Sequence, residues 1–196
     1  MSISMSIDEM KFLLKARLKP GRYRHSLGVA DTAVFLAKRF HVNEEKAYIA
    51  GLLHDCAREY PNDALPEEAR RRGIPIGPVE AAMPLLLHAY VGACRISECY
   101  GVEDDEIAQA VWRHTVGGPH MTPLDKIIYF ADMIEPNRVY PEVEELRQFA
   151  REKSLDEMLL KGLSEYILFV VQKSSLIHPD TVQARNEILL EQKVHG

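Results

Sequence analysis

Apolar residues recur every three or four positions along most of the chain, which is the period of an amphipathic helix. The stretch through Val29, Ala33 and Leu36 shows this spacing, and residues 47–53 are apolar almost all round, as in a buried helix. No stretch alternates apolar and polar residues with the period of a half-buried strand, so we predict no strands. The pattern therefore predicts an all-α fold.

Capping signals predict where several of these helices begin. Ser6 and Glu9 have the spacing of a capping box, and the first helix should run to about Lys19, where Pro20 stops it. Asn43 should cap the helix that leads to the buried run 47–53. The helix that carries His25 is expected to end near residue 40, a short helix should span about 67–72, and another should begin near 84. After a Thr122 cap, a helix should span 123–135. Two last helices should span about 154–177 and 179–193.

Composition and charge narrow the class of protein. The 196 residues carry a formal net charge of −5, with 46% apolar and 27% charged side chains, so we expect one domain, 1–196. The negative charge argues against a general binder of nucleic acid or membrane surfaces, although a metal ion and a few arginines can reverse the sign locally. The longest apolar run, 166–171, is too short to cross a bilayer. Three cysteines without a Cys-x-x-Cys pair suit a reducing cytosol, so we predict a cytoplasmic protein.

Polar side chains that can bind metals extend the apolar faces of several helices. Each is therefore predicted to point into the core. They are His25, His54, Asp55, His88, His114 and Asp132. Any one of them alone could be a buried residue that is satisfied by hydrogen bonds. A cluster of buried charged groups, however, is normally paired or metal-bound, so we predict a metal centre.

The residue types indicate which metals fit. Imidazoles with carboxylates suit Fe, Mn, Zn, Co or Ni better than Ca or Mg. We expect His25, His54, Asp55 and Asp132 to hold the first ion, with His54, Asp55 and Asp132 as the catalytic residues. Asp55 could bridge two ions, in which case His88 and His114 would hold the second; otherwise they would contact phosphate directly. A bound ion lowers the pKa of its water, which could then attack phosphorus.

The order His25, then His54 and Asp55, then Asp132 resembles the HD-domain metal-dependent phosphohydrolases. The local sequences at 23–29, 52–55, 86–93, 113–115 and 125–136 are similar to the YqeK subgroup of that family. The likeness runs from about residue 10 to about residue 190. It implies a helical HD core at about 18–136 followed by C-terminal helices at about 142–193. It also implies a bacterial enzyme, with iron favoured, that cleaves diadenosine tetraphosphate symmetrically into two ADP.

Phosphate oxygens need hydrogen-bond donors, and several side chains are candidates. Arg22 lies about one turn before His25, and Arg58 lies about one turn after Asp55. The resemblance points most to Arg58 and Arg138 for nucleotide contacts, although relatives often carry lysine in place of Arg58. The complete set of predicted substrate contacts is Arg22, Arg58, His88, His114, Thr115, Lys126, Arg138 and His178.

Other interpretations remain open at this point. The same metal chemistry would serve a phosphohydrolase of another nucleotide, such as a nucleoside triphosphate or a cyclic dinucleotide. A sensor that binds ADP or GDP without turnover is a second alternative, but it would have no need to keep six ligands. A transcription regulator would need a basic helix-turn-helix, and the segment before His25 is too short and not strongly basic. The expected partner is a dinucleoside polyphosphate, with no nucleic acid or membrane; a homodimer is allowed.

Overall fold

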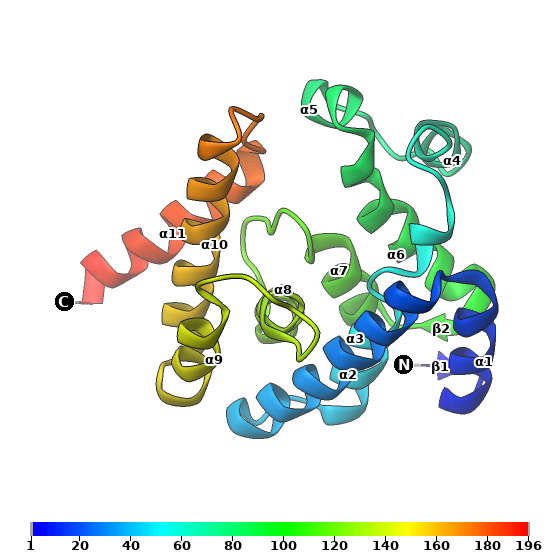
Figure 1. Cartoon of the computed structure of the whole chain (residues 1–196), viewed down its shortest axis with the longest axis horizontal. Helices are drawn as coiled ribbons and strands as arrows, with labels where there is room; N and C mark the ends of the chain where they lie inside the picture. Colours follow the sequence, from blue (N-terminus) through cyan, green and yellow to red (C-terminus); the bar gives the residue numbers. More distant parts are fainter. Residues whose placement is uncertain (1, 196) are drawn as a thin grey trace.

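The structure, a computed structural model, describes residues 2–195 and is almost entirely helical (Figure 1). Its helices are α1 Ile7–Arg17, α2 Pro20–Phe40, α3 Glu44–Leu53, α4 Leu65–Arg71, α5 Pro78–Ala82, α6 Leu87–Tyr100, α7 Asp105–Arg113, α8 Pro123–Ile134, α9 Val143–Glu152, α10 Leu155–Gln172 and α11 Pro179–His195, with short 3₁₀ helices η1 Cys56–Glu59 and η2 Pro84–Leu86. The predicted all-α class is confirmed. Two short strands, β1 Ser2–Ile3 and β2 Val102–Glu103, pair antiparallel. The prediction of no strands missed them, because two residues are too few to show alternation.

Local hydrogen bonds explain most helix boundaries. Ser6 and Thr122 both form the predicted capping boxes, and the Asn43 side chain accepts from the backbone N–H of Lys46. Pro20 does not merely follow α1: it is the first residue of α2, where its missing N–H costs no helical hydrogen bond. The helix α10 ends at Gln172, five residues before the predicted end, and α5 was not predicted.

The helices α2, α3, α7 and α8 pack around the main hydrophobic core, and α8 also contacts α9 and α10. At the crossing of α2 and α3, a side chain on Gly51 would place its Cβ 2.8 Å from the Cα of Ala30. Only glycine permits so close an approach. This crossing brings the middle of α2 beside the end of α3, where two of the predicted ligands lie.

The C-terminal helices attach to the opposite side of α8 from α6 and α7 (Figure 1). A small apolar cluster joins Tyr129 of α8 to Leu159 and Leu163 of α10 and to Ala184 and Ile188 of α11. The predicted boundary between an HD core and a C-terminal extension stays a prediction. Within residues 2–195, no helix is both long enough and apolar enough to cross a membrane.

Candidate metal centre

The predicted ligands come together from five helices. His25 lies in α2, His54 caps the end of α3, Asp55 follows it, His88 lies in the first turn of α6, His114 caps the end of α7, and Asp132 lies near the end of α8. The four histidines and Asp55 are each 7% exposed or less. The side chain of Asp132 is 21% exposed. The cluster is therefore buried on all sides except near Asp132.

One part of the cluster, which we call the His25 half, contains His25, His54, Asp132 and one oxygen of Asp55. The Nε2 atoms of His25 and His54 are 3.2 Å apart. Oδ2 of Asp55 lies 3.6 Å from the first of these nitrogens and 3.4 Å from the second. Oδ1 of Asp132 lies 3.0 Å from Nε2 of His25 and 4.0 Å from Nε2 of His54. Donor atoms of His25, His54 and Asp55 are close enough to hold one metal ion together.

The other part, the His88 half, contains His88, His114 and the second oxygen of Asp55. The two Nε2 atoms are 3.1 Å apart. Oδ1 of Asp55 lies 3.1 Å from Nε2 of His88 and 3.8 Å from Nε2 of His114. These three residues form a second group that could hold an ion. Asp55 therefore faces both halves, with one carboxylate oxygen toward each.

The hydrogen bonds of the histidines show that these groups fit a cation. Nδ1 of His54, His88 and His114 each bonds the backbone carbonyl three residues earlier, and Nδ1 of His25 bonds the Glu135 carboxylate at 3.0 Å. Carbonyls and carboxylates only accept, so each Nδ1 carries a proton, and Nε2 is the ring nitrogen that faces the cluster. When both are unprotonated, two Nε2 atoms 3.2 or 3.1 Å apart cannot hydrogen-bond each other. A transition-metal ion between them would accept both lone pairs.

The charges in and around the cluster also favour a bound cation. Burial raises the pKa of the Asp55 carboxyl, but the facing His54 and His88 outweigh burial and hold it well below its usual range. For Asp132, burial is likewise outweighed by the hydrogen bond to His25 and the charge of Arg138, and its pKa is lowered. Burial lowers the pKa of His54, but the charge and hydrogen bond of Asp55, together with the charge of Asp132, outweigh burial and raise it. Without a metal, a proton on His54 would offset the two carboxylates, and a metal cation would serve in its place.

His114 behaves differently from His54. Burial, followed by the charges on His54 and His88, lowers the pKa of His114 to about 3. Its ring is therefore neutral, and its Nε2 is free of a proton, at any physiological pH. The hydroxyl of Thr115 lies 3.0 Å from this nitrogen and 3.4 Å from Nε2 of His88.

Three predicted phosphate contacts lie at the edge of the cluster. Arg22 donates to Oδ2 of Asp55 at 2.7 Å. Arg58, on η1, has its pKa lowered chiefly by burial and feels the charges of both Asp55 and Arg22. Arg138 donates to the Asp132 backbone carbonyl at 2.8 Å and also pairs with the Asp132 carboxylate. Arginine guanidinium groups thus lie beside both carboxylates.

Two other predicted substrate contacts have partners of their own. Lys126 pairs with Asp156 of α10. Six residues are about one and two-thirds helical turns, so its side chain leaves α8 on a different face from Asp132. His178 is buried at the turn before α11, where Nε2 lies 2.9 Å from Oε1 of Glu80. The structure pairs neither residue with a ligand of the cluster.

Sequence reasoning missed Glu135, which supports His25. Its second oxygen accepts from the backbone N–H of Asn137 at 2.7 Å and from the Asn137 side chain at 2.8 Å. A Cβ on Gly28 would lie 2.3 Å from this carboxylate. The glycine inside α2, one turn after His25, was the available signal, because a helical glycine often marks close approach of another group.

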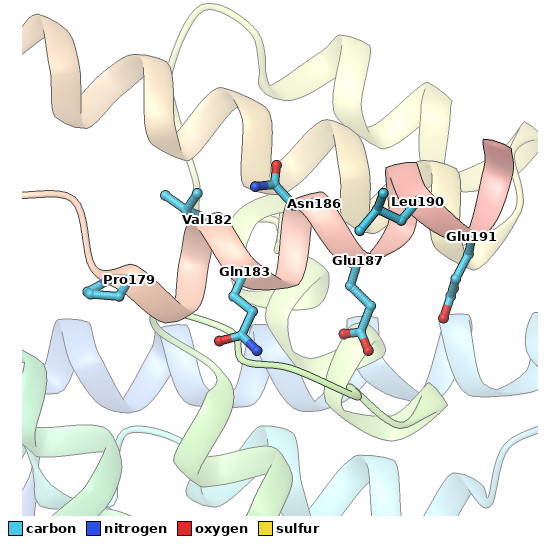
Figure 2. A pocket seen from close by; sticks show the side chains of 7 residues that line it. All are labelled: Pro179, Val182, Gln183, Asn186, Glu187, Leu190 and Glu191. Atoms are coloured by element: carbon cyan, nitrogen blue, oxygen red, sulfur yellow. The ribbon is translucent and has the colours of Figure 1, made fainter. Parts of the chain in front are cut away.

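A groove of about 660 Å³ runs along α11, lined by Pro179, Val182, Gln183, Asn186, Glu187, Leu190 and Glu191. Figure 2 shows Val182, Asn186 and Leu190 along one edge of the helix and Gln183, Glu187 and Glu191 along the other. The groove is apolar and contains no predicted ligand. We assign the chemistry to the cluster rather than to this groove, because only the cluster brings together groups that could activate water.

Comparison with known proteins agrees with this geometry. The HD domain family matches residues 22–137. The chain is 37% identical to the symmetrical bis(5′-nucleosyl)-tetraphosphatase of Bacillus subtilis, over 93% of this chain and 97% of that protein. It is 38% identical to the protein of the same name from Halalkalibacterium halodurans, over 92% of this chain and 96% of that protein.

A solved structure is similar over almost the whole chain. It is the crystal structure of a protein from Clostridium acetobutylicum, described as a predicted HD superfamily hydrolase involved in NAD metabolism. The two share 39% of their residues with a TM-score of 0.91, over 96% of this chain and all of the other. The sequence match, the shared fold and the cluster agree: this chain belongs to the HD domain family.

Proposed function

We propose that this chain is a metal-dependent hydrolase that cleaves diadenosine tetraphosphate symmetrically into two ADP. The observation that carries the metal part is the two pairs of histidines whose Nε2 atoms face one another on either side of Asp55. The substrate part rests on relatives of nearly equal length that are named symmetrical bis(5′-nucleosyl)-tetraphosphatases. Together they favour an enzyme over a sensor, because a binding protein has no need of a buried metal centre beside phosphate-binding arginines.

The ligands would divide as follows. His25, His54, Asp55 and Asp132 would hold the first ion, and His88 and His114 would hold a second ion with Asp55 or would contact phosphate. The bound metal would supply a water of lowered pKa and would offset charge on the phosphoryl group. Iron is the favoured metal, and Mn, Co, Zn or Ni suit the same nitrogen and oxygen donors. The Nδ1 hydrogen bonds keep the rings oriented, so that binding requires no rearrangement.

The arginines would bind the phosphate chain. Arg22 and Arg138 are paired with Asp55 and Asp132, and each could exchange part of that pairing for a phosphate oxygen. Burial lowers the pKa of Arg58, and within residues 2–195 its guanidinium donates to Asn62 alone, at 3.3 Å, which leaves donors for an anion. The Thr115 hydroxyl could donate to a phosphate oxygen at the His88 half. We propose no substrate role for Lys126, because its side chain leaves α8 on a different face from Asp132 and pairs with Asp156 of α10.

The site of cleavage depends on how many phosphates separate the nucleoside from the metal centre. We propose that one adenosine lies near the 136–140 loop, which carries Arg138, and near the 177–181 turn. Arg58 and Arg138 would then hold a bridging phosphate at the cluster. A pocket that accommodates a diphosphate beyond that point gives ADP, and a shorter pocket would give AMP and ATP.

Digestion of diadenosine tetraphosphate in ¹⁸O-water tests the proposal. Metal-free protein would be supplied in turn with each of Fe, Mn, Co, Zn and Ni ions, and the products would be separated and weighed by mass spectrometry. We expect two ADP, one of them carrying a single ¹⁸O on its terminal phosphate. His54→Ala is the control that should release no product. Release of AMP with ATP would show that the enzyme cleaves at a different phosphate from the one proposed. No turnover with any metal would favour a sensor that binds nucleotide without cleaving it.

A further inference from the structure

His25 differs from the other three histidines of the cluster in what holds its ring. His54 and His114 cap the ends of α3 and α7, where the last carbonyls have no helical partner, and each bonds one of them. His88 begins α6 and bonds the carbonyl of Leu85. His25 lies inside α2, where the backbone carbonyls are already used by the helix. Its Nδ1 therefore needs an acceptor from elsewhere, and Glu135 supplies it at 3.0 Å.

The Glu135 carboxylate is fixed on every side. It is 1% exposed, and its other oxygen accepts two hydrogen bonds from Asn137, at 2.7 and 2.8 Å. Its backbone carbonyl accepts from Arg147 at 2.7 Å. Gly28 leaves the space that the carboxylate occupies, since a Cβ there would lie 2.3 Å away. A buried carboxylate that is so tightly held, and whose one remaining bond goes to a ligand ring, has a role in orienting that ring.

We propose that Glu135 is a positioning residue that strengthens metal binding by the His25 half of the cluster. An ionised carboxylate on Nδ1 pushes electron density onto Nε2 and fixes the ring, more strongly than a neutral carbonyl can. In the His88 half, both Nδ1 atoms bond neutral backbone carbonyls, so these rings gain no such charge. The inference rests on the proposed metal centre but not on the proposed substrate.

Metal titration of Glu135→Gln tests this directly. Glutamine keeps the size of the side chain and an oxygen for the His25 ring, but it removes the charge. Metal-free protein would be titrated with Zn²⁺ against a competing chelator at about pH 8, where protons compete least. We expect about a 10- to 100-fold loss of affinity, which is usual when such a partner is removed. When Glu135→Gln is combined with His114→Gln, which weakens the His88 half, it should still lower the Zn²⁺ affinity. When it is combined with His25→Gln, it should cause no further loss of affinity.

Two further variants separate positioning from general stability. Gly28→Ala leaves Glu135 unchanged and suits a helix, but its methyl group would displace the carboxylate, so it should reproduce the loss of affinity even if Glu135→Gln folds poorly. Glu80→Gln is the matched control, because Glu80 is also a buried carboxylate paired with a histidine, His178, outside the cluster. Its Zn²⁺ affinity should equal that of the unaltered protein.

Other outcomes would contradict the role of Glu135 or the metal centre itself. Unchanged Zn²⁺ affinity in folded Glu135→Gln and Gly28→Ala would overturn the inference while leaving the metal centre intact. An equal loss in Glu80→Gln, or a loss that persists in the His25→Gln background, would also overturn it, because the effect would then not pass through His25. An unaltered protein that binds no Zn²⁺, Fe²⁺ or Mn²⁺ would overturn the metal centre itself.

Discussion

The two halves of the cluster share Asp55 but are supported by different parts of the fold. The histidines of the His88 half stand at helix ends, and local backbone carbonyls orient them. In the His25 half, the ring of His25 is oriented by a carboxylate that lies 110 residues away in the sequence, and Asp132 comes from the same distant segment. A histidine at a helix end finds an acceptor in its own turn, whereas one inside a helix depends on tertiary packing. The His25 half therefore depends more on how α2 meets α8.

The largest expected effect comes from Asp55→Ala, which removes the only ligand that both halves share. We expect the bound metal to be lost and kcat/KM to fall by about a thousandfold or more, since the metal-bound water and the charge compensation are lost together. Elemental analysis and steady-state kinetics would measure this, with circular dichroism to check that helical content is kept. Full metal content in this variant would contradict the shared-ligand arrangement.

A smaller effect is expected when only the His88 half is altered. The double variant His88→Gln, His114→Gln should keep an ion in the His25 half but lose about a hundredfold in turnover. Its melting temperature should change by less than about 4 °C, the shift that about 1 kcal/mol produces in a chain of this length. A large loss of stability with normal turnover would mean that the two rings serve packing rather than chemistry.

The pH dependence of metal binding should also differ between the halves. The pKa of His54 is raised, because Asp55 and Asp132 together outweigh the effect of burial, so its proton must leave before the His25 half can bind a metal. The pKa of His114 is about 3, so this ligand is already unprotonated. As the pH falls from about 8 to about 5.5, affinity should decrease more steeply in His114→Gln, which keeps the His25 half, than in His25→Gln. Parallel curves from Zn²⁺ titration would argue against this difference.

The smallest effect is expected from Thr115→Val. The hydroxyl lies beside the Nε2 atoms of His88 and His114, but it is neutral and does not hydrogen-bond Nδ1 of either ring. Its loss should weaken Zn²⁺ binding by no more than about threefold, well below the effect of a charged partner. Zn²⁺ titration of Thr115→Val and Glu135→Gln under the same conditions compares the two effects. A loss as large as that of Glu135→Gln would show that the two halves are not supported differently.

Much of the site could be predicted from the sequence, because helical periodicity and capping are local. The apolar faces pointed His25, His54 and His114 inward, and the structure buries all three. The cap at Thr122 placed α8, and hence Asp132, in the correct element. The order of motifs indicated the family, which the comparisons confirm.

Other features could not be predicted, because they depend on which helices cross and on which side. Lys126 and Asp132 lie on one helix, yet packing against α10 gives Lys126 a partner in Asp156. The importance of Glu135 was hidden, since a carboxylate at a helix end is ordinarily read as exposed. Gly28 signals that some group approaches α2 closely, but the sequence does not show that this group is Glu135.

The sequence by itself determined most of the helices, their buried faces and the six candidate ligand side chains, because these follow from spacing along a single helix and from hydrogen bonds within one turn. The tertiary structure alone decided that Asp55 faces both histidine pairs, that each Nδ1 is occupied and that each Nε2 faces the cluster. Those facts depend on contacts between helices far apart in sequence, and ridge-and-groove packing, not local propensity, sets where such helices meet.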